Sequence, residues 1–205
     1  LQGEAHKIIP CDVSEFEAAQ SVVADAVKFD GVKLDGCLFS AGIYAMYPVA
    51  AVKHDSVQAM FQTNFFSFVA ILKAFSSRRI SNDGASFVSV SSRAAMMPDK
   101  AQGVYGASKA AMNAYSVAAA KELAPRKIRV NTICPESVDT PMGAGLKENM
   151  PPEQLRKIYP LGMLTAADVA NTAIYLLSGQ STKITGQSIW LSAGNDGGAV
   201  EGHIF

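Results

Sequence analysis

The chain has 205 residues, of which 49% are hydrophobic and 18% are charged, and its 18 basic and 18 acidic residues give a formal net charge of +0 at pH 7. These proportions exclude a chain that is disordered throughout, and the balanced charge argues against nucleic-acid binding. No apolar run reaches the roughly 20 residues that span a bilayer, and the first residues lack the pattern of a signal peptide. We therefore expect a single cytoplasmic domain over residues 1–205, with no membrane partner.

Short apolar segments alternate along the chain with segments of helical periodicity. The first apolar segment ends at Asp12, and Ser14 with Glu17 forms the pattern of a capping box, which opens a helix. Helices are predicted over residues 15–29, 55–81, 103–124 and 166–178. Strands are predicted over residues 7–12, 36–39, 86–91, 128–133 and 187–191, and residues 136–161 are predicted to form a polar loop.

This alternation predicts an α/β fold in three layers, α/β/α, in which right-handed crossovers build a parallel sheet with helices on both faces. In such sheets the ligand lies beyond the carboxyl ends of the strands. The residues that follow the strands are therefore the first candidates for a site: Asp12, 40–42, 91–94 and 135–140. The glycine-rich residues 194–205 are expected to form a tail.

Three cysteines, Cys11, Cys37 and Cys134, lie in apolar segments, and no two of them have the spacing of a CxxC pair. We expect them to be buried free thiols, as in a reducing compartment. No metal site is expected.

Tyr105 and Lys109 are four residues apart at the start of a predicted helix, so their side chains lie on one face, one turn apart. An ammonium beside a phenol lowers the phenol's pKa from its usual value of about 10, which makes the oxygen a usable acid and base. Ser92 follows a predicted strand, where a hydroxyl can hydrogen-bond a substrate oxygen. Asn64 lies in an apolar helix, where its amide needs partners. Each residue alone also fits a structural role: an exposed lysine beside a packed tyrosine, a turn cap or a buried amide.

In combination these residues resemble the classical short-chain dehydrogenase/reductase family, and within it the 3-oxoacyl-[acyl-carrier-protein] reductases. The resemblance covers almost the whole chain and rests on motifs in the family's order: Asp12-Val13, Ala41-Gly42, Asn64, Ser92, Tyr105-Gly-Ala-Ser-Lys109 and Pro135-x-x-Val138-x-Thr140-Pro141. It implies a Rossmann-like, doubly wound parallel sheet. It also implies hydride transfer between NAD(P) and an alcohol or ketone, in which the cofactor carries the hard chemistry.

The resemblance implies a role for each matching residue. Tyr105 would be the general acid and base, and Lys109 would lower its pKa and bind the nicotinamide ribose. Ser92 would hold the substrate oxygen, and Asn64 would support a water relay. Cofactor contacts, from the adenine to the nicotinamide end, are implied for Asp12, Val13, Ala41, Gly42, Pro135, Val138 and Thr140.

The family's first strand, glycine-rich phosphate loop and second strand have no counterpart in the chain. We expect the native protein to have an N-terminal segment that this sequence lacks; a short chain with a rearranged sheet or a partner strand is the alternative. In the usual strand order the first two strands separate the strand at 7–12 from the next one, so residues 7–10 are expected to have no neighbour. NAD and NADP both remain open as the cofactor, and the chain as it stands is expected to bind a dinucleotide poorly.

Smaller departures occur at two strand ends. Phe39 and Ser40 stand where the family often has asparagines before Ala41-Gly42, and Glu136 stands where it often has a glycine after Pro135. We expect Glu136 to be a solvated loop residue. The alternative is a carboxylate that changes the backbone geometry or contacts the substrate.

Residues 140–163 correspond to the segment that covers the substrate, and methionines in and beside it suit an apolar or variable substrate. The first expected reaction is reduction of a small-molecule or carrier-bound 3-oxoacyl thioester or a related carbonyl. A sugar or polyol dehydrogenase is the alternative within the family, and a catalytically silent scaffold is the alternative from another class. Small and aromatic residues on the two long helices favour a homodimer or homotetramer.

Overall fold

The computed structural model describes residues 6–143, 145 and 149–195. The helices are α1 (Phe16–Asp30), α2 (His54–Phe61), α3 (Ser67–Phe75), α4 (Gly103–Leu123), α6 (Pro152–Ile158) and α7 (Ala166–Leu177). The strands are β1 (Leu34–Phe39), β2 (Ser81–Val90), β3 (Arg129–Pro135) and β4 (Ser188–Leu191). In this part of the chain no helix combines the length and the apolar character that crossing a membrane requires.

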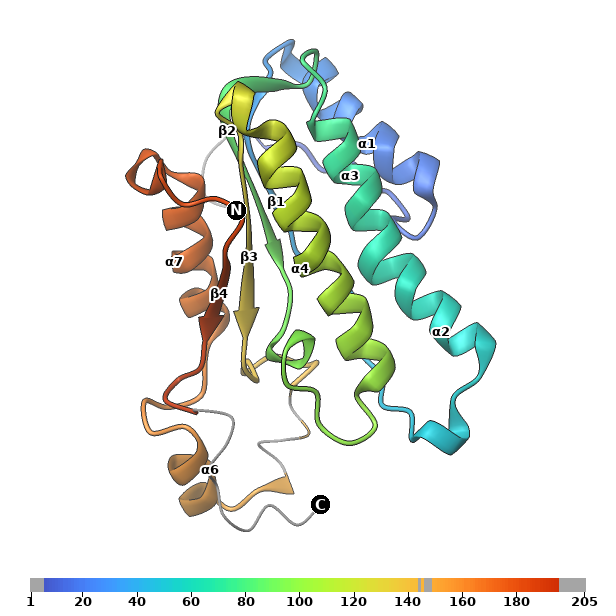
Figure 1. The fold of residues 1–205 in the computed structure, drawn as a ribbon, viewed down its shortest axis with the longest axis vertical. Coiled ribbons are helices and arrows are strands. Elements are labelled where there is room, and N and C mark those ends of the chain that lie inside the picture. Colours follow the sequence, from blue (N-terminus) through green and yellow to red (C-terminus); the bar gives the residue numbers. More distant parts are fainter. Residues whose placement is uncertain (1–5, 144, 146–148, 196–205) are drawn as a thin grey trace.

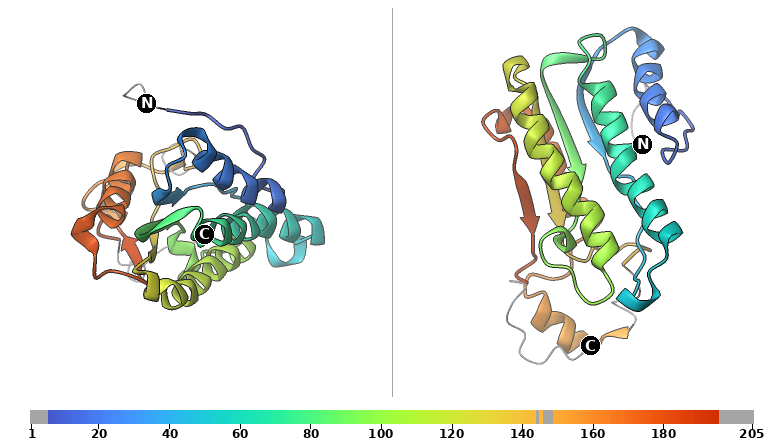
Figure 2. Two further views of the ribbon diagram at one scale, coloured as in Figure 1. Left: turned by 90° about the horizontal axis from the view of Figure 1, so that it is seen from above. Right: turned by 45° about the vertical axis from the view of Figure 1, so that its right-hand side comes forward.

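The four strands form one parallel sheet in the order β1-β2-β3-β4 (Figure 1). Phe87 in β2 pairs with Cys37 in β1 and with Val130 in β3, which sets the register of the three strands. Helices α3 and α4 pack on one face of the sheet, whereas α7 packs on the other, as the end-on view in Figure 2 shows. α1 packs against α3. The predicted three-layer α/β fold is confirmed.

Both faces of the sheet are buried, as a parallel sheet requires. Phe87 points to the side of α3 and α4, where it packs with Phe75 and Met112, all three without exposed surface. The next residue along β2, Val88, points to the opposite side and packs with Leu176 of α7. This alternation along one strand explains why the apolar segments of the sequence are continuous.

Residues 7–10 do not form the predicted strand. Within the described ranges β1 pairs only with β2, so residues 7–10 have no strand beside them, and Ile8 is 84% exposed. An extended segment becomes a strand only when a neighbour takes up its backbone hydrogen bonds. The expectation that this segment has no strand neighbour is thereby confirmed, and the strand assignment is wrong.

The predicted capping box before α1 is also wrong. The N-cap of α1 is Glu15, which makes no side-chain cap hydrogen bond. Ser14 instead turns back, and both its amide and its hydroxyl donate to Asp12 Oδ1, at 2.9 and 2.7 Å. A capping box does form at α7, between Thr165 and Asp168, which the sequence analysis did not single out.

The predicted helix over residues 55–81 is divided into three parts and ends earlier. A π-helical turn, Gln62–Phe66, separates α2 from α3, and α3 ends at Phe75. Residues 81–85 belong to β2 because Ser81 pairs with Leu34 of β1, a contact that the local periodicity does not reveal. The predicted polar loop over 136–161 likewise contains α6, and the predicted tail from residue 196 onward lies outside the described residues.

Candidate active site

Of the sequence-predicted site residues, Ser92, Tyr105 and Lys109 lie together beyond the carboxyl end of β2, the end that its arrowhead marks in Figure 1. Ser92 follows β2 directly and is the N-cap of the short turn Arg93–Ala95, with its hydroxyl accepting a hydrogen bond from the Ala94 amide at 3.1 Å. Tyr105 lies in the first turn of α4, and Lys109 lies one turn further on. The turn after β2 packs against α4, so the three side chains share one location.

Tyr105 lies between Ser92 and Lys109 in this group: it interacts with the Ser92 hydroxyl, and the Lys109 ammonium faces its ring. The Ser92 hydroxyl hydrogen-bonds the Tyr105 phenol, which by itself lowers the phenol's pKa. The Lys109 Nζ lies 5.9 Å from the centroid of the Tyr105 ring. It also donates to the Val90 carbonyl at 2.9 Å, at the last residue of β2.

Burial is the largest cause of the pKa shifts of both Tyr105 and Lys109. It raises the pKa of Tyr105, and the hydrogen bond from Ser92 offsets only part of that rise. The expected net lowering of the Tyr105 pKa is therefore wrong, because desolvation of the phenolate outweighs the nearby polar groups. Burial also lowers the pKa of Lys109 from 10.5 to about 8, since the residue is only 4% exposed.

Asn64 is fully buried in the π-helical turn, and its side-chain amide hydrogen-bonds both backbone and side-chain groups. Its Oδ1 accepts from the Ile43 amide at 2.8 Å, while its Nδ2 donates to the Ile43 carbonyl at 3.0 Å and to Ser108 Oγ at 3.1 Å. One amide therefore joins the segment after β1 to α4. A π-helical turn inside a helix is often found at functional sites.

Gly42 lies between these groups. A Cβ at this position would stand 3.2 Å from Asn64 Oδ1 and 3.3 Å from Lys109 Nζ, which is closer than ordinary contact. A larger residue at this position would require one of these side chains to move by a few tenths of an ångström. The Ala41-Gly42 motif thus has a packing reason in this chain.

Of the remaining predicted cofactor residues, Pro135, Val138 and Thr140 lie at the end of β3 or in the segment that follows it. Pro135 ends β3 and is buried, and Val138 forms a parallel bridge with Leu164. The Thr140 hydroxyl donates to the Val138 carbonyl at 3.3 Å. Asp12 and Val13 precede α1, and Gln62 ties their segment to the π-helical turn by donating to the Ser14 carbonyl at 2.5 Å. Asp12 is exposed, and its hydrogen bonds with Ser14 lower its pKa.

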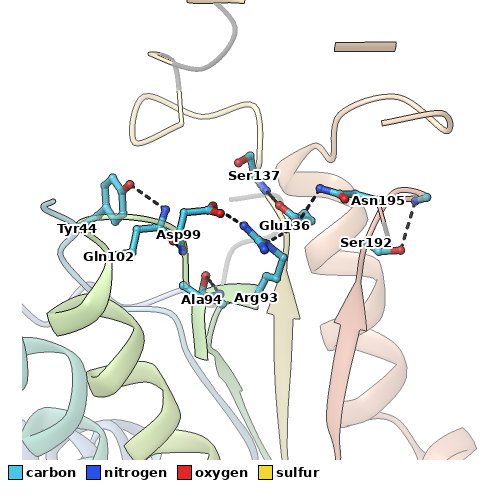
Figure 3. A network of polar contacts seen from close by, with 11 residues as sticks. Tyr44, Arg93, Ala94, Asp99, Gln102, Glu136, Ser137, Ser192 and Asn195 are labelled. Carbon is cyan, nitrogen blue, oxygen red and sulfur yellow. Dashed lines mark hydrogen bonds and ion pairs between the residues drawn. The ribbon is translucent and has the colours of Figure 1, made fainter. Parts of the chain in front are cut away.

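Two features of the site were not found from the sequence. The ring of Tyr44, in the segment after β1, packs edge-on against Tyr105 with the centroids 4.9 Å apart, and Gln102 Nε2 donates to its hydroxyl at 3.2 Å. Glu136 is 7% exposed and forms an ion pair with Arg93, so its assignment as a solvated loop residue is wrong (Figure 3). A lone tyrosine and a lone arginine carry no pattern that could have identified them.

The prediction of three buried free thiols is confirmed in full only for Cys134. All three cysteines are free thiols; Cys134 is buried, and Cys11 and Cys37 are partly exposed. Burial of the Cys37 thiol raises its pKa to about 12. Among the described residues no group of three or more His, Cys, Asp or Glu side chains could hold a metal ion.

The sequence model of a family described as enoyl-(acyl carrier protein) reductase matches residues 1–196. The chain belongs to the short-chain dehydrogenase/reductase family. It is similar to carbonyl reductase family member 4 of Danio rerio, with 32% identity over 195 residues that cover 95% of this chain and 79% of that protein. It is also similar to 3-oxoacyl-[acyl-carrier-protein] reductase of Homo sapiens, with 32% identity over 193 residues covering 94% and 78% of the two chains.

Among solved structures, a short-chain dehydrogenase from Burkholderia cenocepacia in complex with NADP has a TM-score of 0.83 and 25% identity, covering 91% of this chain and 75% of that one. The short-chain dehydrogenase/reductase fold and the enzyme class predicted for the chain are confirmed. This protein is an oxidoreductase of that family.

Proposed function

We propose that this short-chain dehydrogenase/reductase interconverts a ketone and a secondary alcohol by hydride transfer with NAD(P), and that its substrate is a 3-oxoacyl thioester or a related carbonyl. The observation that carries the proposal is the meeting of Ser92, Tyr105 and Lys109 at the end of β2, with the phenol hydrogen-bonded to the serine. A purely structural role does not require a buried lysine beside this pair. The relatives named as 3-oxoacyl-[acyl-carrier-protein] reductase and carbonyl reductase support the same reaction class.

Proton transfer falls to Tyr105. Its pKa is raised, so the phenol is protonated at neutral pH and can donate to a carbonyl oxygen as that oxygen gains negative charge. The Ser92 hydroxyl, already in contact with the phenol, is placed to hydrogen-bond the same oxygen. Both groups act on an atom whose charge develops during the reaction, where a hydrogen bond contributes most to the rate.

The residues present fit the nicotinamide end of a dinucleotide. NAD(P) supplies or accepts the hydride when it is bound. Gly42 leaves free the space that a Cβ would fill between Asn64 and Lys109, and the Lys109 ammonium, with three donors, has one acceptor in Val90. Lys109 would hold the ribose hydroxyls there. Ala41 and Gly42 would lie against the adenosine ribose, and the cofactor's ends would contact Asp12, Val13, Pro135, Val138 and Thr140.

Asn64 would act through position. Its side-chain amide is committed to Ile43 and Ser108, so it holds the segment after β1 against α4. A proton relay that involves Asn64 would therefore use its backbone rather than its side-chain amide. That arrangement keeps Lys109 and Gly42 in place.

Exposed apolar side chains favour an apolar substrate over a sugar. Met46 after β1, Met96 after Ser92 and Met142 in the segment over 140–163 are all exposed and follow the carboxyl ends of the strands. Methionine adapts to chains of varying shape. This favours an acyl chain or an apolar ketone, and makes a polyol the second candidate.

The assembly and the compartment are part of the same proposal. Phe66, Tyr115 and Val117 are partly exposed on the π-helical turn and on α4, a face that would suit pairing with a second copy as a homodimer or homotetramer. We propose a cytoplasmic location, in keeping with three free thiols. Light scattering on the purified protein tests the assembly, and a monomer at micromolar concentration contradicts it.

Steady-state turnover tests the reaction. The complete protein, with any sequence that flanks these residues, is assayed for oxidation of NADH and NADPH with acetoacetyl-CoA and D-erythrulose, and for reduction of NAD(P) with sorbitol. We expect the highest kcat/KM with acetoacetyl-CoA and a loss of at least about 100-fold in kcat for Tyr105→Phe. Tyr175→Phe, on the exposed face of α7, is the matched control and is expected to keep wild-type turnover. Turnover that survives Tyr105→Phe contradicts the proposal.

A further inference from the structure

Arg93 and Glu136 join the two segments that carry the site. Arg93 follows Ser92 directly, and Glu136 follows Pro135 directly. The Arg93 Nε contacts Glu136 Oε1, and their side chains are only 14% and 4% exposed (Figure 3). A single buried ion pair thus connects the neighbour of Ser92, the proposed substrate-binding residue, with the neighbour of Pro135, a proposed nicotinamide contact.

Further polar contacts hold both partners of this pair in one orientation. The Arg93 Nη2 contacts Asp99 Oδ2 at 2.5 Å. Glu136 Oε1 also accepts from Asn195 Nδ2 at 3.2 Å, and Glu136 Oε2 accepts from the Ser137 amide at 3.2 Å (Figure 3). The ends of β2, β3 and β4 are therefore tied together through one guanidinium and one carboxylate.

The charges alone do not explain why the pair is present. Burial raises the pKa of Glu136 and Asp99 raises it further, whereas Arg93 lowers it. Two carboxylates share one guanidinium, and removing such a pair from water costs about as much as their attraction returns. A buried pair of this kind is a poor source of stability, so its contribution is better sought in the geometry that it imposes.

That geometry bears directly on Ser92. Its backbone is extended, with φ −162° and ψ 156°, and Arg93 begins the turn whose Ala94 amide donates to the Ser92 hydroxyl. If Arg93 is held at Glu136, the turn cannot move along the sheet edge, and the Ser92 hydroxyl keeps its contact with Tyr105. Displacement of a reacting group by about 1 Å can lower a rate by about 100-fold.

We propose that the Arg93–Glu136 ion pair is a positioning device that sets the Ser92 hydroxyl relative to Tyr105 and to the segment after Pro135. Its effect on turnover rests on the proposed function, whereas its effect on the contact between Ser92 and Tyr105 does not. Arg93 and Glu136 are positioning residues that act through Ser92. The pair should therefore be visible both in kcat and in the titration of Tyr105.

The test measures both quantities in the complete protein for Glu136→Gln and Arg93→Lys. The Tyr105 titration is followed by NMR of ring-labelled tyrosine and assigned with Tyr105→Phe. We expect each variant to raise the Tyr105 pKa towards the value in Ser92→Ala, and to lower kcat with acetoacetyl-CoA by about 10- to 100-fold at nearly unchanged KM. Loss of the Glu136 charge would by itself lower the phenol's pKa, so a rise in Glu136→Gln cannot arise from the charge.

A matched control is Arg126→Lys, because Arg126 is also a buried arginine in an ion pair, with Asp83 near the amino end of β2. It is expected to leave the Tyr105 pKa and kcat unchanged even if the melting temperature falls. An unchanged Tyr105 pKa in both Arg93→Lys and Glu136→Gln overturns the inference, as does an equal rise in Arg126→Lys. If the wild type turns over none of the probes, the proposed function fails while the titration still decides on the ion pair.

Discussion

Asn64 and Ile43 exchange two hydrogen bonds, at 2.8 Å from the Ile43 amide to Oδ1 and at 3.0 Å from Nδ2 to the Ile43 carbonyl. A single buried side chain thereby satisfies both backbone groups of the residue after Gly42. No strand in the described part of the chain pairs with the segment after β1 at this point, so this amide replaces the hydrogen bonds that a sheet would provide.

Asn64→Ala is expected to destabilise the fold by about 2 to 4 kcal/mol, because it leaves the Ile43 amide and carbonyl without partners and opens a cavity. Urea denaturation measures the change in the free energy of unfolding. Asn171→Ala, on the exposed face of α7, is the control and is expected to stay within about 0.5 kcal/mol of wild type. Equal stability of Asn64→Ala and wild type would contradict the anchoring role.

Gly42→Ala places a methyl group 3.2 Å from Asn64 Oδ1 and 3.3 Å from Lys109 Nζ. We expect a loss of about 1 to 3 kcal/mol in the free energy of unfolding, since backbone and buried side chains must shift to admit it. Gly103→Ala is the matched control, because its Cβ meets no atom within 4 Å at the start of α4. That control is expected to be neutral or slightly stabilising, as alanine favours helix over glycine. Similar losses for both variants would disprove the steric argument.

Lys109→Met separates stability from catalysis. The pKa of Lys109 falls from 10.5 to about 8 on folding, which corresponds to a cost of burial of about 3 kcal/mol. Removing the ammonium is expected to stabilise the fold at pH 7 by up to about that amount, reduced by the contribution of the hydrogen bond to the Val90 carbonyl that is lost. Turnover is expected to be lost.

The pH dependence of this difference has a definite sign. Below about pH 8 the lysine is protonated in both states, so the cost is fully present. Between about pH 8 and pH 10.5 the unfolded state binds more protons than the folded state. The free energy of unfolding of the wild type therefore rises with pH relative to that of Lys109→Met. Denaturation at pH 7 and pH 10 measures the difference in the free energy of unfolding between Lys109→Met and the wild type. A difference that is as large at pH 10 as at pH 7 argues against a charged, buried Lys109.

The raised pKa of Tyr105 predicts opposite pH profiles for the two directions of the reaction. Ketone reduction needs the phenol, so its rate should hold through neutral pH and fall only in the alkaline range. Alcohol oxidation needs the phenolate, so its rate should rise over that same range. Ser92→Ala removes the hydrogen bond that lowers the Tyr105 pKa, so the fall in the reduction rate and the rise in the oxidation rate should both move to higher pH. Profiles of kcat/KM measure the shift, and a shift to lower pH contradicts the assignment.

The local sequence pattern predicted those features of the protein that depend on residues close together in the chain. The alternation of apolar and helical segments predicted the parallel sheet, and the spacing of Tyr105 and Lys109 predicted that they share one face of α4. Ser92 was found because the end of an apolar strand marks the ligand edge of such a sheet. These features arise from the 3.6-residue turn of a helix and the two-residue repeat of a strand.

Other features required contacts between residues far apart in the chain. The same apolar pattern forms a strand at residues 34–39, where β2 lies beside it, and none at residues 7–10. The partner of Glu136 is an arginine on another strand end, and the direction of the Tyr105 pKa follows from burial rather than from the adjacent lysine. Strand pairing, ion pairing and desolvation depend on which atoms surround a group in space. For this protein the sequence by itself indicated most of the elements and the candidate reacting side chains, and only the tertiary structure decided where the elements begin and end and how those side chains are held and ionised.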